Sequence, residues 1–442
     1  MPADPRSATT IFCFEDRSVD RLNPATTARP AYAISCASLR LIDHLEALRV
    51  PIFGECRPHL AEVQRLDFGL TEPPASPERG PATLLVNARV VPNLNNVALL
   101  ERMLRDRQPA VVRDSEGKVA MAWLPPGHPS RECDPGDSGL AGEGRMGGPS
   151  GDQDTRLGID EWAERVTVEL PAVTELADTF QWPHDIVLHH MRSMSAAMEW
   201  RIAGGDYEQI ADGVFVAPGA KIGDHAVIDV SKGPILIERD AQVGPFCFLA
   251  GPVHIGAGAR ILEHAALKDA VALGHTTKVG GEVEASVIEP FTNKQHHGFL
   301  GHSYLGSWIN LGAGTCNSDL KNTYGTINME YGAEKVATEM QFMGCVMGDY
   351  SKTAINTGIF TGKVVGVCSM LYGFVTSNVP SFVNYARLFG QTATLPPEVM
   401  ISTQARMFSR RRVTQRPCDQ QLIFDMFELT EEERNLQSAI GL

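Results

Sequence analysis

The sequence predicts a parallel β-helix of hexapeptide repeats, with an α/β domain before it and a short helical tail after it. Two observations predict the β-helix. Aliphatic residues recur every six positions from Ile210 to about Leu371, and small or turn-forming residues follow many of them, as in Ile222-Gly223-Asp224. A period of six fits neither a helix nor a long two-sided strand, but it suits short strands separated by tight turns. Such strands bury their aliphatic side chains only when they stack as coils.

The six-residue phase is kept over most of the second half of the chain. The phase holds in three runs, with a three-residue slip at Ser231-Lys232-Gly233 inside the first: Ile210, Val216, Ile222, Ile228, then Ile237, Val243, Leu249, Ile255, Ile261, Leu267, Leu273 and Val279; it returns at Leu305 and Leu311, and again at Met347, Ile359, Val365 and Leu371. The phase is lost around 287–299, and a polar stretch follows between Asn317 and Phe342. Insertions in solenoids usually lie on one face and often carry the site, so we expect two insertions here. The alternative is chance Gly and Val richness in an ordinary β protein.

The first half of the chain reads as an α/β domain. Thr10 to Phe14 is a buried strand that ends in Glu15-Asp16, and 83–91 is a second buried strand that carries Asn87 and Arg89. Ligands gather at the carboxyl ends of the strands in an open α/β sheet, so these polar residues are candidates for a site. Further predicted elements are helices over 38–48 and 97–105, a hairpin of 110–112 with 119–124, and helical stretches within 161–202.

Changes in composition along the chain indicate where the domains begin and end. We assign residues 1–200 to the α/β domain, 205–385 to the β-helix and 386–442 to the helical tail. The segment 125–155 is rich in Gly, Pro, Ser and Asp, so we expect a flexible insertion there. A chain of 442 residues exceeds the usual limit for one core, in agreement with two domains.

Charge and cysteine usage exclude several classes of protein. The formal charge of −14 argues against a nucleic-acid partner, and negatively charged substrates would need local basic pockets. Nine cysteines without CxxC spacing fit a reducing compartment. No apolar segment reaches 18 residues, and the N-terminus lacks a basic region followed by an apolar run. We therefore expect a cytoplasmic protein without a membrane partner.

The densest polar run is Gly301-His302-Ser303-Tyr304-Leu305-Gly306-Ser307-Trp308-Ile309-Asn310-Leu311-Gly312-Ala313-Gly314-Thr315-Cys316-Asn317-Ser318-Asp319. It resembles the acetyltransferase half of the bacterial bifunctional glucosamine-1-phosphate N-acetyltransferase/N-acetylglucosamine-1-phosphate uridylyltransferase, which makes UDP-N-acetylglucosamine. The whole chain looks closer to a less characterised group, in which a degenerate sugar-nucleotidyltransferase domain precedes the β-helix. The resemblance implies a left-handed β-helix, an exception to the usual crossover hand, and a homotrimer with sites between neighbouring subunits.

The resemblance also implies roles for individual residues of this run. His302 matches the general base, Tyr304 a substrate-contacting tyrosine, and Asn310 and Asn317 two polar site residues, of which we assign Asn317 to catalysis. An ammonium must lose a proton before it attacks a thioester, and imidazole suits that task near neutral pH. Fixed amide or backbone donors then stabilise the tetrahedral oxyanion. The alternative is that His302 only caps a turn while the asparagines form a stacked ladder.

Basic residues outside this run are candidates for binding phosphates. Lys294 is a candidate sugar-phosphate contact, although the register is lost there. Arg411 and Arg412, in the run 410–412, are candidates for the phosphates of acetyl-CoA, because the family's C-terminal segment packs near that substrate. The alternative is that the arginine run lies on the surface in contact with solvent and binds no ligand.

The first half lacks the Gly-rich loop with which uridylyltransferases of the family hold nucleotide phosphates. Arg29 is a candidate phosphate contact and Asp16 a candidate Mg²⁺ ligand, as phosphoryl transfer would need. Asn87 is expected to line the same crevice. A surface arginine, a strand-end carboxylate and a structural asparagine are the alternatives.

The sequence thus predicts an enzyme of sugar-nucleotide metabolism. The β-helix would transfer an acetyl group from acetyl-CoA to an amino sugar phosphate, and the first domain would bind or make a nucleotide sugar, with Mg²⁺. One alternative is nucleotidyl transfer alone, with the β-helix as a trimerisation scaffold. The other is a non-catalytic trimer that binds a nucleotide sugar.

Overall fold

The computed structural model describes residues 9–73, 81–128, 153–386 and 391–439. The chain divides into two compact units. The α/β unit comprises Met1–Asp20, Arg29–Ile34 and Arg40–Gln181, and the solenoid unit comprises Arg21–Ala28, Ser35–Leu39 and Trp182–Leu442. Two short N-terminal segments therefore belong to the solenoid unit. Most of the predicted insertion 125–155 lies outside the described residues.

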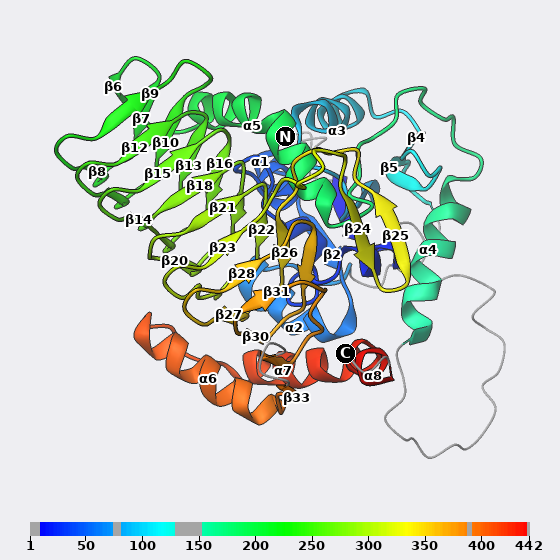
Figure 1. The fold of residues 1–442 in the computed structure, drawn as a ribbon. Coiled ribbons are helices and arrows are strands. Elements are labelled where there is room, and N and C mark those ends of the chain that lie inside the picture. Colours follow the sequence, from blue (N-terminus) through cyan, green and yellow to red (C-terminus); the bar gives the residue numbers. More distant parts are fainter. Residues whose placement is uncertain (1–8, 74–80, 129–152, 387–390, 440–442) are drawn as a thin grey trace. The chain divides into compact units, whose positions relative to one another are not determined.

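The α/β unit is built on a five-stranded sheet in the order β2-β1-β3-β5-β4 (Figure 1). Its elements are β1 (Thr9–Phe14), α1 (Leu41–Ala47), β2 (Ile52–Glu55), α2 (Ala61–Val63), β3 (Ala82–Asn87), α3 (Leu94–Asp106), β4 (Ala110–Arg113), β5 (Val119–Leu124) and α4 (Gln153–Thr167), with the short helices η2 (Arg17–Leu22), η3 (Ala31–Ala33), η4 (Pro58–Leu60) and η5 (Gln64–Phe68). β1 pairs in parallel with β2 and β3, while β4 and β5 form an antiparallel hairpin. The predicted α/β class and hairpin are confirmed.

The solenoid unit winds short parallel strands into three faces, consistent with the predicted left-handed β-helix (Figure 1). The first face holds β6 (Glu208–Ala211), β7 (Val214–Val216), β10 (Ile235–Ile237), β13 (Val253–Ile255), β16 (Val271–Leu273), β19 (Val287–Ile288), β22 (Tyr304–Leu305), β26 (Cys345–Met347) and β29 (Lys363–Val365). The second face holds β8 (Lys221–Ile222), β11 (Gln242–Val243), β14 (Arg260–Ile261), β17 (Lys278–Val279) and β20 (Asn293–Lys294), then β27 (Lys352–Thr353), β30 (Met370–Leu371), β32 (Val383–Ala386) and β33 (Gln391–Thr394). The third face holds β9 (Val227–Asp229), β12 (Phe248–Ala250), β15 (Ala266–Lys268), β18 (Glu282–Glu284) and β21 (Phe299–Gly301), then β23 (Cys316–Asn317), β28 (Gly358–Ile359) and β31 (Phe374–Val375).

Within the described residues, four α-helices belong to the same unit. They are α5 (His184–Gly204), α6 (Pro397–Arg410), α7 (Pro417–Leu429) and α8 (Glu431–Ala439). α5 leads into the first coil and packs beside β22, whereas α6 to α8 form the predicted helical tail. Among the described residues, no helix combines the length and the apolar content that a bilayer crossing requires.

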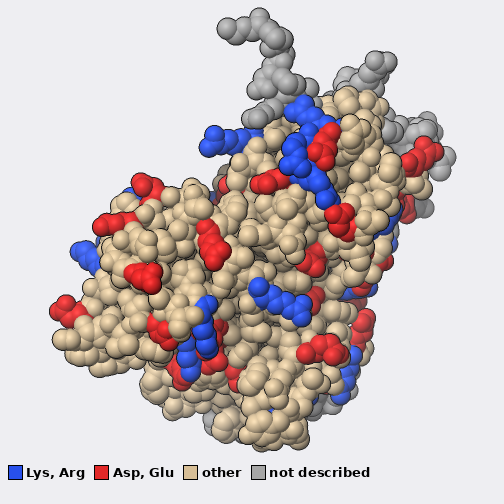
Figure 2. All heavy atoms as spheres, turned by 90° about the horizontal axis from the view of Figure 1, so that it is seen from above, with Lys and Arg blue, Asp and Glu red and all other residues tan. Residues whose placement is uncertain are grey.

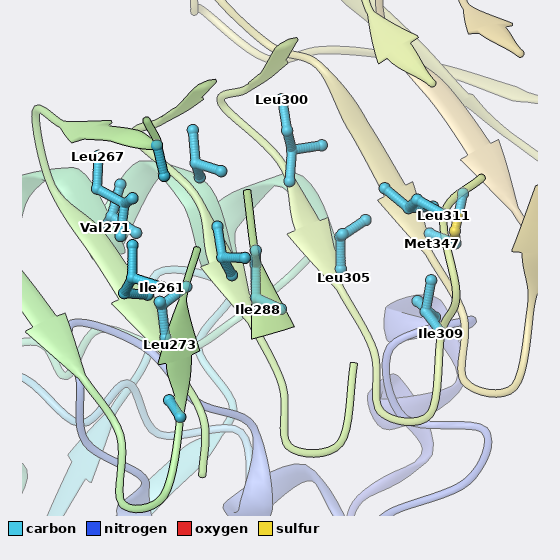
Figure 3. Packing of buried hydrophobic residues seen from close by; sticks show 14 of the residues in the cluster. Ile261, Leu267, Val271, Leu273, Ile288, Leu300, Leu305, Ile309, Leu311 and Met347 are labelled. Carbon is cyan, nitrogen blue, oxygen red and sulfur yellow. The ribbon is translucent and has the colours of Figure 1, made fainter. Parts of the chain in front are cut away.

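The core of the solenoid is a column of aliphatic side chains that point inward from the three faces (Figure 3). Leu300, Leu305 and Leu311 occupy successive interior positions, each at most 3% exposed. Each such side chain contributes about 1.5–3 kcal/mol on full burial, so the six-residue rhythm is the main stabilising feature. The predicted repeat is confirmed from Val216 onward. Ile210 is 49% exposed, because β6 is an antiparallel edge strand outside the coils.

The two predicted insertions have different outcomes. The first is wrong: β19, β20 and β21 supply all three faces around 287–299, and Lys294 takes the interior position that Val279 holds in the preceding coil. The second is confirmed, because the polar stretch after Asn317 leaves the coil and forms the antiparallel hairpin of β24 (Asn328–Tyr331) and β25 (Glu334–Ala337). On the surface, acidic and basic side chains are interspersed over the face seen in Figure 2.

Candidate active site

His302 lies at a corner of the solenoid, between β21 and β22. Its backbone adopts the left-handed conformation, with φ of 47°, and its N–H donates to the Glu284 carbonyl at 3.0 Å. The side chain is 11% exposed. The corner turns the imidazole outward, while its neighbours in β21 and β22 continue the coil.

Two residues fix the ring of His302. The Nδ1 atom lies 2.8 Å from Oδ2 of Asp319, and the ring stacks on Phe342 with centroids 5.2 Å apart. The carboxylate accepts a hydrogen bond from the Nδ1–H group, so the free lone pair of the ring lies on Nε2. Within the described part of the chain, no group hydrogen-bonds Nε2. The geometry is that of an oriented general base.

Asp319 and Phe342 stand at the two ends of the hairpin insertion. Leu320 pairs with Phe342 in an antiparallel bridge, and the Met343 N–H donates to the Asp319 carbonyl at 2.8 Å. The base of the insertion therefore holds both groups that orient His302. Sequence reasoning named Asp319 as part of the run but gave it no role.

Asn317 fills an interior position of the third face. Its Oδ1 accepts from the Gly301 N–H at 2.8 Å, and its Nδ2 donates to the Gly301 carbonyl at 2.9 Å and to Ser303 Oγ at 3.3 Å. A Cβ on Gly301 would strike Asp319, and one on Gly344 would strike the Gly301 carbonyl. The amide thus holds the Gly301 backbone and the Ser303 hydroxyl, on either side of His302. Its predicted catalytic role as an oxyanion donor remains a prediction, and this bonding favours a positioning role.

Tyr304 is fully buried, in disagreement with the predicted substrate contact. Its hydroxyl donates to Glu289 Oε1 at 3.0 Å. Glu289 is 1% exposed, and it also accepts from the Ser35 N–H at 2.8 Å and from Ser35 Oγ at 2.9 Å. An N-terminal segment of the solenoid unit therefore covers the tyrosine from the outside, and the hydroxyl has a structural partner.

Lys294 is also turned inward, so the structure does not favour the predicted sugar-phosphate contact. Its Nζ donates to the carbonyls of Gly280 at 2.8 Å, His296 at 3.2 Å and Gly298 at 2.6 Å. Burial lowers the pKa of Lys294 to about 8. All three ammonium protons have backbone acceptors, so the side chain ties the corner between β20 and β21.

A basic pocket of about 440 Å³ opens on the second face, against the end of α6. Its lining combines Asn310 with four cationic side chains and no carboxylate: Lys278, Lys352, Arg410 and Arg411, together with Phe291, Asn293, Gln295, His296, Trp308, Ile309 and Met407. Phe291 and Trp308 stack with centroids 4.1 Å apart, and Trp308 also packs on Phe408. Cationic groups beside a flat aromatic surface suit a ligand with phosphates and a ring.

Three cations of this pocket, Lys278, Arg410 and Arg411, lie close enough to affect one another. Burial, then the charges of Arg411, Arg260 and Arg410, lowers the pKa of Lys278. Burial lowers the pKa of Lys352 to about 8. Arg411 also donates to Asn293 Oδ1. An anion bound here would relieve this mutual repulsion. Of the two predicted coenzyme A contacts, the pocket contains Arg411; Arg412 is exposed and is not part of the lining.

In the α/β unit, the predicted site residues Asp16 and Asn87 lie together at the carboxyl ends of β1 and β3. Asn87 Nδ2 donates to Asp16 Oδ2 at 2.9 Å, and Arg89 forms an ion pair with the same carboxylate at 2.7 Å. Arg29 is half-buried and comes from a different segment of the chain than Asp16 and Asn87. Its backbone carbonyl accepts a hydrogen bond from Arg57 Nη2 at 3.2 Å. The predicted phosphate contact of Arg29 stays a prediction.

Comparisons with known proteins agree with this two-part organisation. Residues 11–204 match the sugar nucleotidyl transferase family. The chain is 34% identical over 118 residues to the bifunctional protein GlmU of Ralstonia pickettii, a match that covers 26% of this chain and 25% of that protein. It is 26% identical over 143 residues to the bifunctional sugar-1-phosphate nucleotidylyltransferase/acetyltransferase of Sulfurisphaera tokodaii, covering 32% of this chain and 36% of that protein. The matches thus span about a quarter to a third of these relatives.

A solved structure is also similar in part. It is the UDP-N-acetylglucosamine acyltransferase of Francisella novicida, with 16% sequence identity and a TM-score of 0.20, covering 49% of this chain and 77% of that one. The chain is thus similar to the sugar nucleotidyl transferases over residues 11–204 and, over about a quarter of its length, to the bifunctional protein GlmU.

Proposed function

We propose that the solenoid unit transfers an acetyl group from acetyl-CoA to the amine of an amino sugar phosphate, as a step of sugar-nucleotide biosynthesis. The observation that carries this proposal is the pair of His302 and Asp319, with Nδ1 held at 2.8 Å from the carboxylate and Nε2 open. The pair lies within the run that resembles the acetyltransferase site. The names of the GlmU relatives support the same chemistry.

In the proposed reaction, Nε2 of His302 takes a proton from the attacking amine. The amine nitrogen forms a bond to the thioester carbonyl carbon, and the carbonyl oxygen becomes an oxyanion. The oxyanion returns its electrons, the carbon–sulfur bond breaks, and the imidazolium gives its proton to the leaving thiolate. Asp319 stabilises the imidazolium between these steps, because its carboxylate bears the opposite charge. The products are the amide and free coenzyme A.

The basic pocket is the proposed binding site for the phosphates of acetyl-CoA. Among the described residues, its lining holds four cations and no carboxylate, which suits the phosphate groups of the donor. The pocket lies on the second face, whereas His302 lies at the corner between the third and first faces, so we propose that pocket and base meet across neighbouring subunits. We further propose a cytoplasmic homotrimer, in which a neighbouring subunit completes each site.

Thiol release from acetyl-CoA, measured with and without glucosamine-1-phosphate, tests the proposal. His302→Ala should lower the acceptor-dependent rate by about 10²–10⁴-fold, the usual contribution of a general base. His264 is a matched control, because it also lies at a left-handed corner, with φ of 62°, and stacks on an aromatic ring, that of Phe246. His264→Ala should leave the rate unchanged. Equal rates for wild type and His302→Ala would remove His302 from the mechanism.

A second candidate function is nucleotidyl transfer in the α/β unit, with the solenoid as a trimerisation scaffold. The family match over residues 11–204 favours it. Pyrophosphate release from UTP with N-acetylglucosamine-1-phosphate measures this activity, and Arg29→Ala tests the proposed phosphate contact. If neither thiol nor pyrophosphate is released, the third function, a non-catalytic trimer that binds a nucleotide sugar, is favoured.

A further inference from the structure

A buried polar cluster closes the carboxyl edge of the sheet in the α/β unit. Asp16, Asn87, Arg89 and Asp114 are 6%, 1%, 0% and 2% exposed. Nucleotides and their metal ions bind at this edge in open α/β sheets, and carboxylate and amide oxygens are the ligands that Mg²⁺ prefers. We infer that Arg89 holds the position that a divalent cation would take, so the edge carries a built-in cation and binds no metal.

The carboxylate of Asp16 accepts hydrogen bonds from protein donors at both oxygens. Arg89 binds it with two parallel hydrogen bonds, from Nε to Oδ1 and from Nη2 to Oδ2, both 2.7 Å long. Asn87 Nδ2 adds a third bond to Oδ2, at 2.9 Å. A bidentate guanidinium and carboxylate pair is among the strongest hydrogen-bonded contacts in proteins. A metal ion at either oxygen would compete with this pair for the carboxylate charge.

The second carboxylate of the cluster, Asp114, is held in the same way. Its Oδ2 accepts from Thr179 Oγ1 at 3.0 Å, from Gln181 Nε2 at 3.1 Å and from Arg89 Nη2 at 3.4 Å. Burial alone would raise the pKa of Asp114, but the hydrogen bonds from Lys118, Thr179 and Gln181 and the charge of Arg89 together lower it. The carboxylate is thus kept ionised by protein donors and a protein cation.

The guanidinium has no alternative position within this arrangement. Its remaining nitrogen, Nη1, donates to the Phe180 carbonyl at 2.9 Å, so Nε, Nη1 and Nη2 all have acceptors. A metal ion at the edge would meet the positive charge of Arg89 and would leave that charge buried without its partner, which is strongly unfavourable. In the described part of the chain, no three His, Cys, Asp or Glu side chains are grouped so as to hold a metal. The predicted Mg²⁺ ligand Asp16 therefore does not fit that role, and the second candidate function, nucleotidyl transfer in this unit, would need its metal bound elsewhere.

Titration of the full chain with Mn²⁺, followed by electron paramagnetic resonance, tests the inference. Wild type should bind no stoichiometric Mn²⁺, with or without UTP. Arg89→Ala should bind about one Mn²⁺ per chain, because it exposes the carboxylates of Asp16 and Asp114 to the ion. Adding Asp16→Asn to that variant should abolish the binding. Arg102→Ala, which removes the exposed ion pair with Glu175 in the same unit, is the matched control and should gain no Mn²⁺.

Two outcomes would overturn the inference. The first is stoichiometric Mn²⁺ binding by wild type that Asp16→Asn abolishes, a comparison that does not depend on any Arg89 variant. The second is a folded Arg89→Ala protein that binds no Mn²⁺; Arg89→Gln serves instead if Arg89→Ala does not fold. Thiol release reports on the solenoid unit, so the acetyl-transfer proposal stands or falls separately.

Discussion

Replacing Asp319 with Asn tests how much the carboxylate contributes to acetyl transfer. The substitution keeps the size of the side chain but removes the negative charge 2.8 Å from Nδ1 of His302. A hydrogen bond to a charged group contributes about 1.5–3 kcal/mol. Because each 1.36 kcal/mol is a tenfold change in rate, kcat should fall by about 10- to 150-fold. KM for acetyl-CoA should change little, because the basic pocket is untouched.

The assay is thiol release at saturating acetyl-CoA and acceptor. Asp319→Glu keeps the charge and should recover part of the lost rate. Glu238→Gln is a matched control, since Glu238 is another solenoid carboxylate beside a histidine, with His254 Nε2 at 3.2 Å. A kcat for Asp319→Asn equal to that of Glu238→Gln would refute the orienting role of the carboxylate.

Three further predictions concern stability and donor binding. Buried His190 accepts from the Ala37 N–H and donates to the Ala270 carbonyl, and burial lowers its pKa to about 4. The unfolded chain therefore binds this proton first, near pH 6.5, so about 3 kcal/mol of stability present above pH 6.5 should be lost as the pH falls to about 4. Denaturant midpoints should show this loss in wild type beyond that in His190→Gln, and parallel curves would contradict it. Arg411→Ala should raise KM for acetyl-CoA about tenfold with kcat nearly unchanged, because it removes one phosphate contact; an unchanged KM would place the donor elsewhere. Lys294→Ala should lower the melting temperature and leave KM for the sugar phosphate unchanged, since three carbonyls lose their donor; the reverse result would restore the substrate contact that the sequence predicted.

The fold of the solenoid could be predicted because each coil must bury an aliphatic side chain on each face. The aliphatic pattern does not predict the interior positions of Lys294 and Asn317, because both side chains are polar. Both are accommodated because backbone carbonyls and N–H groups of the coil satisfy them. The coil therefore continues where the aliphatic pattern stops.

The contacts of the candidate site were less predictable. Asp319 meets His302 from 17 residues along the chain, about one coil, so the spacing itself was the signal that could have found the pair. Tyr304 is covered through Glu289 and Ser35, a contact across 254 residues that no local pattern indicates. In the α/β unit, Asn87 and Asp16 were correctly expected at one edge of the sheet, but the pairing of Asp16 with Arg89 depends on how neighbouring strand ends meet.

The most direct test of the account is a crystal structure with coenzyme A and the amino sugar phosphate bound together. We expect the acceptor nitrogen about 2.6–3.2 Å from Nε2 of His302. The Nδ1 atom should still be hydrogen-bonded to Asp319, and the coenzyme A phosphates should lie beside Arg411. An acceptor amine bound away from Nε2, with the imidazole facing only protein groups, would contradict it.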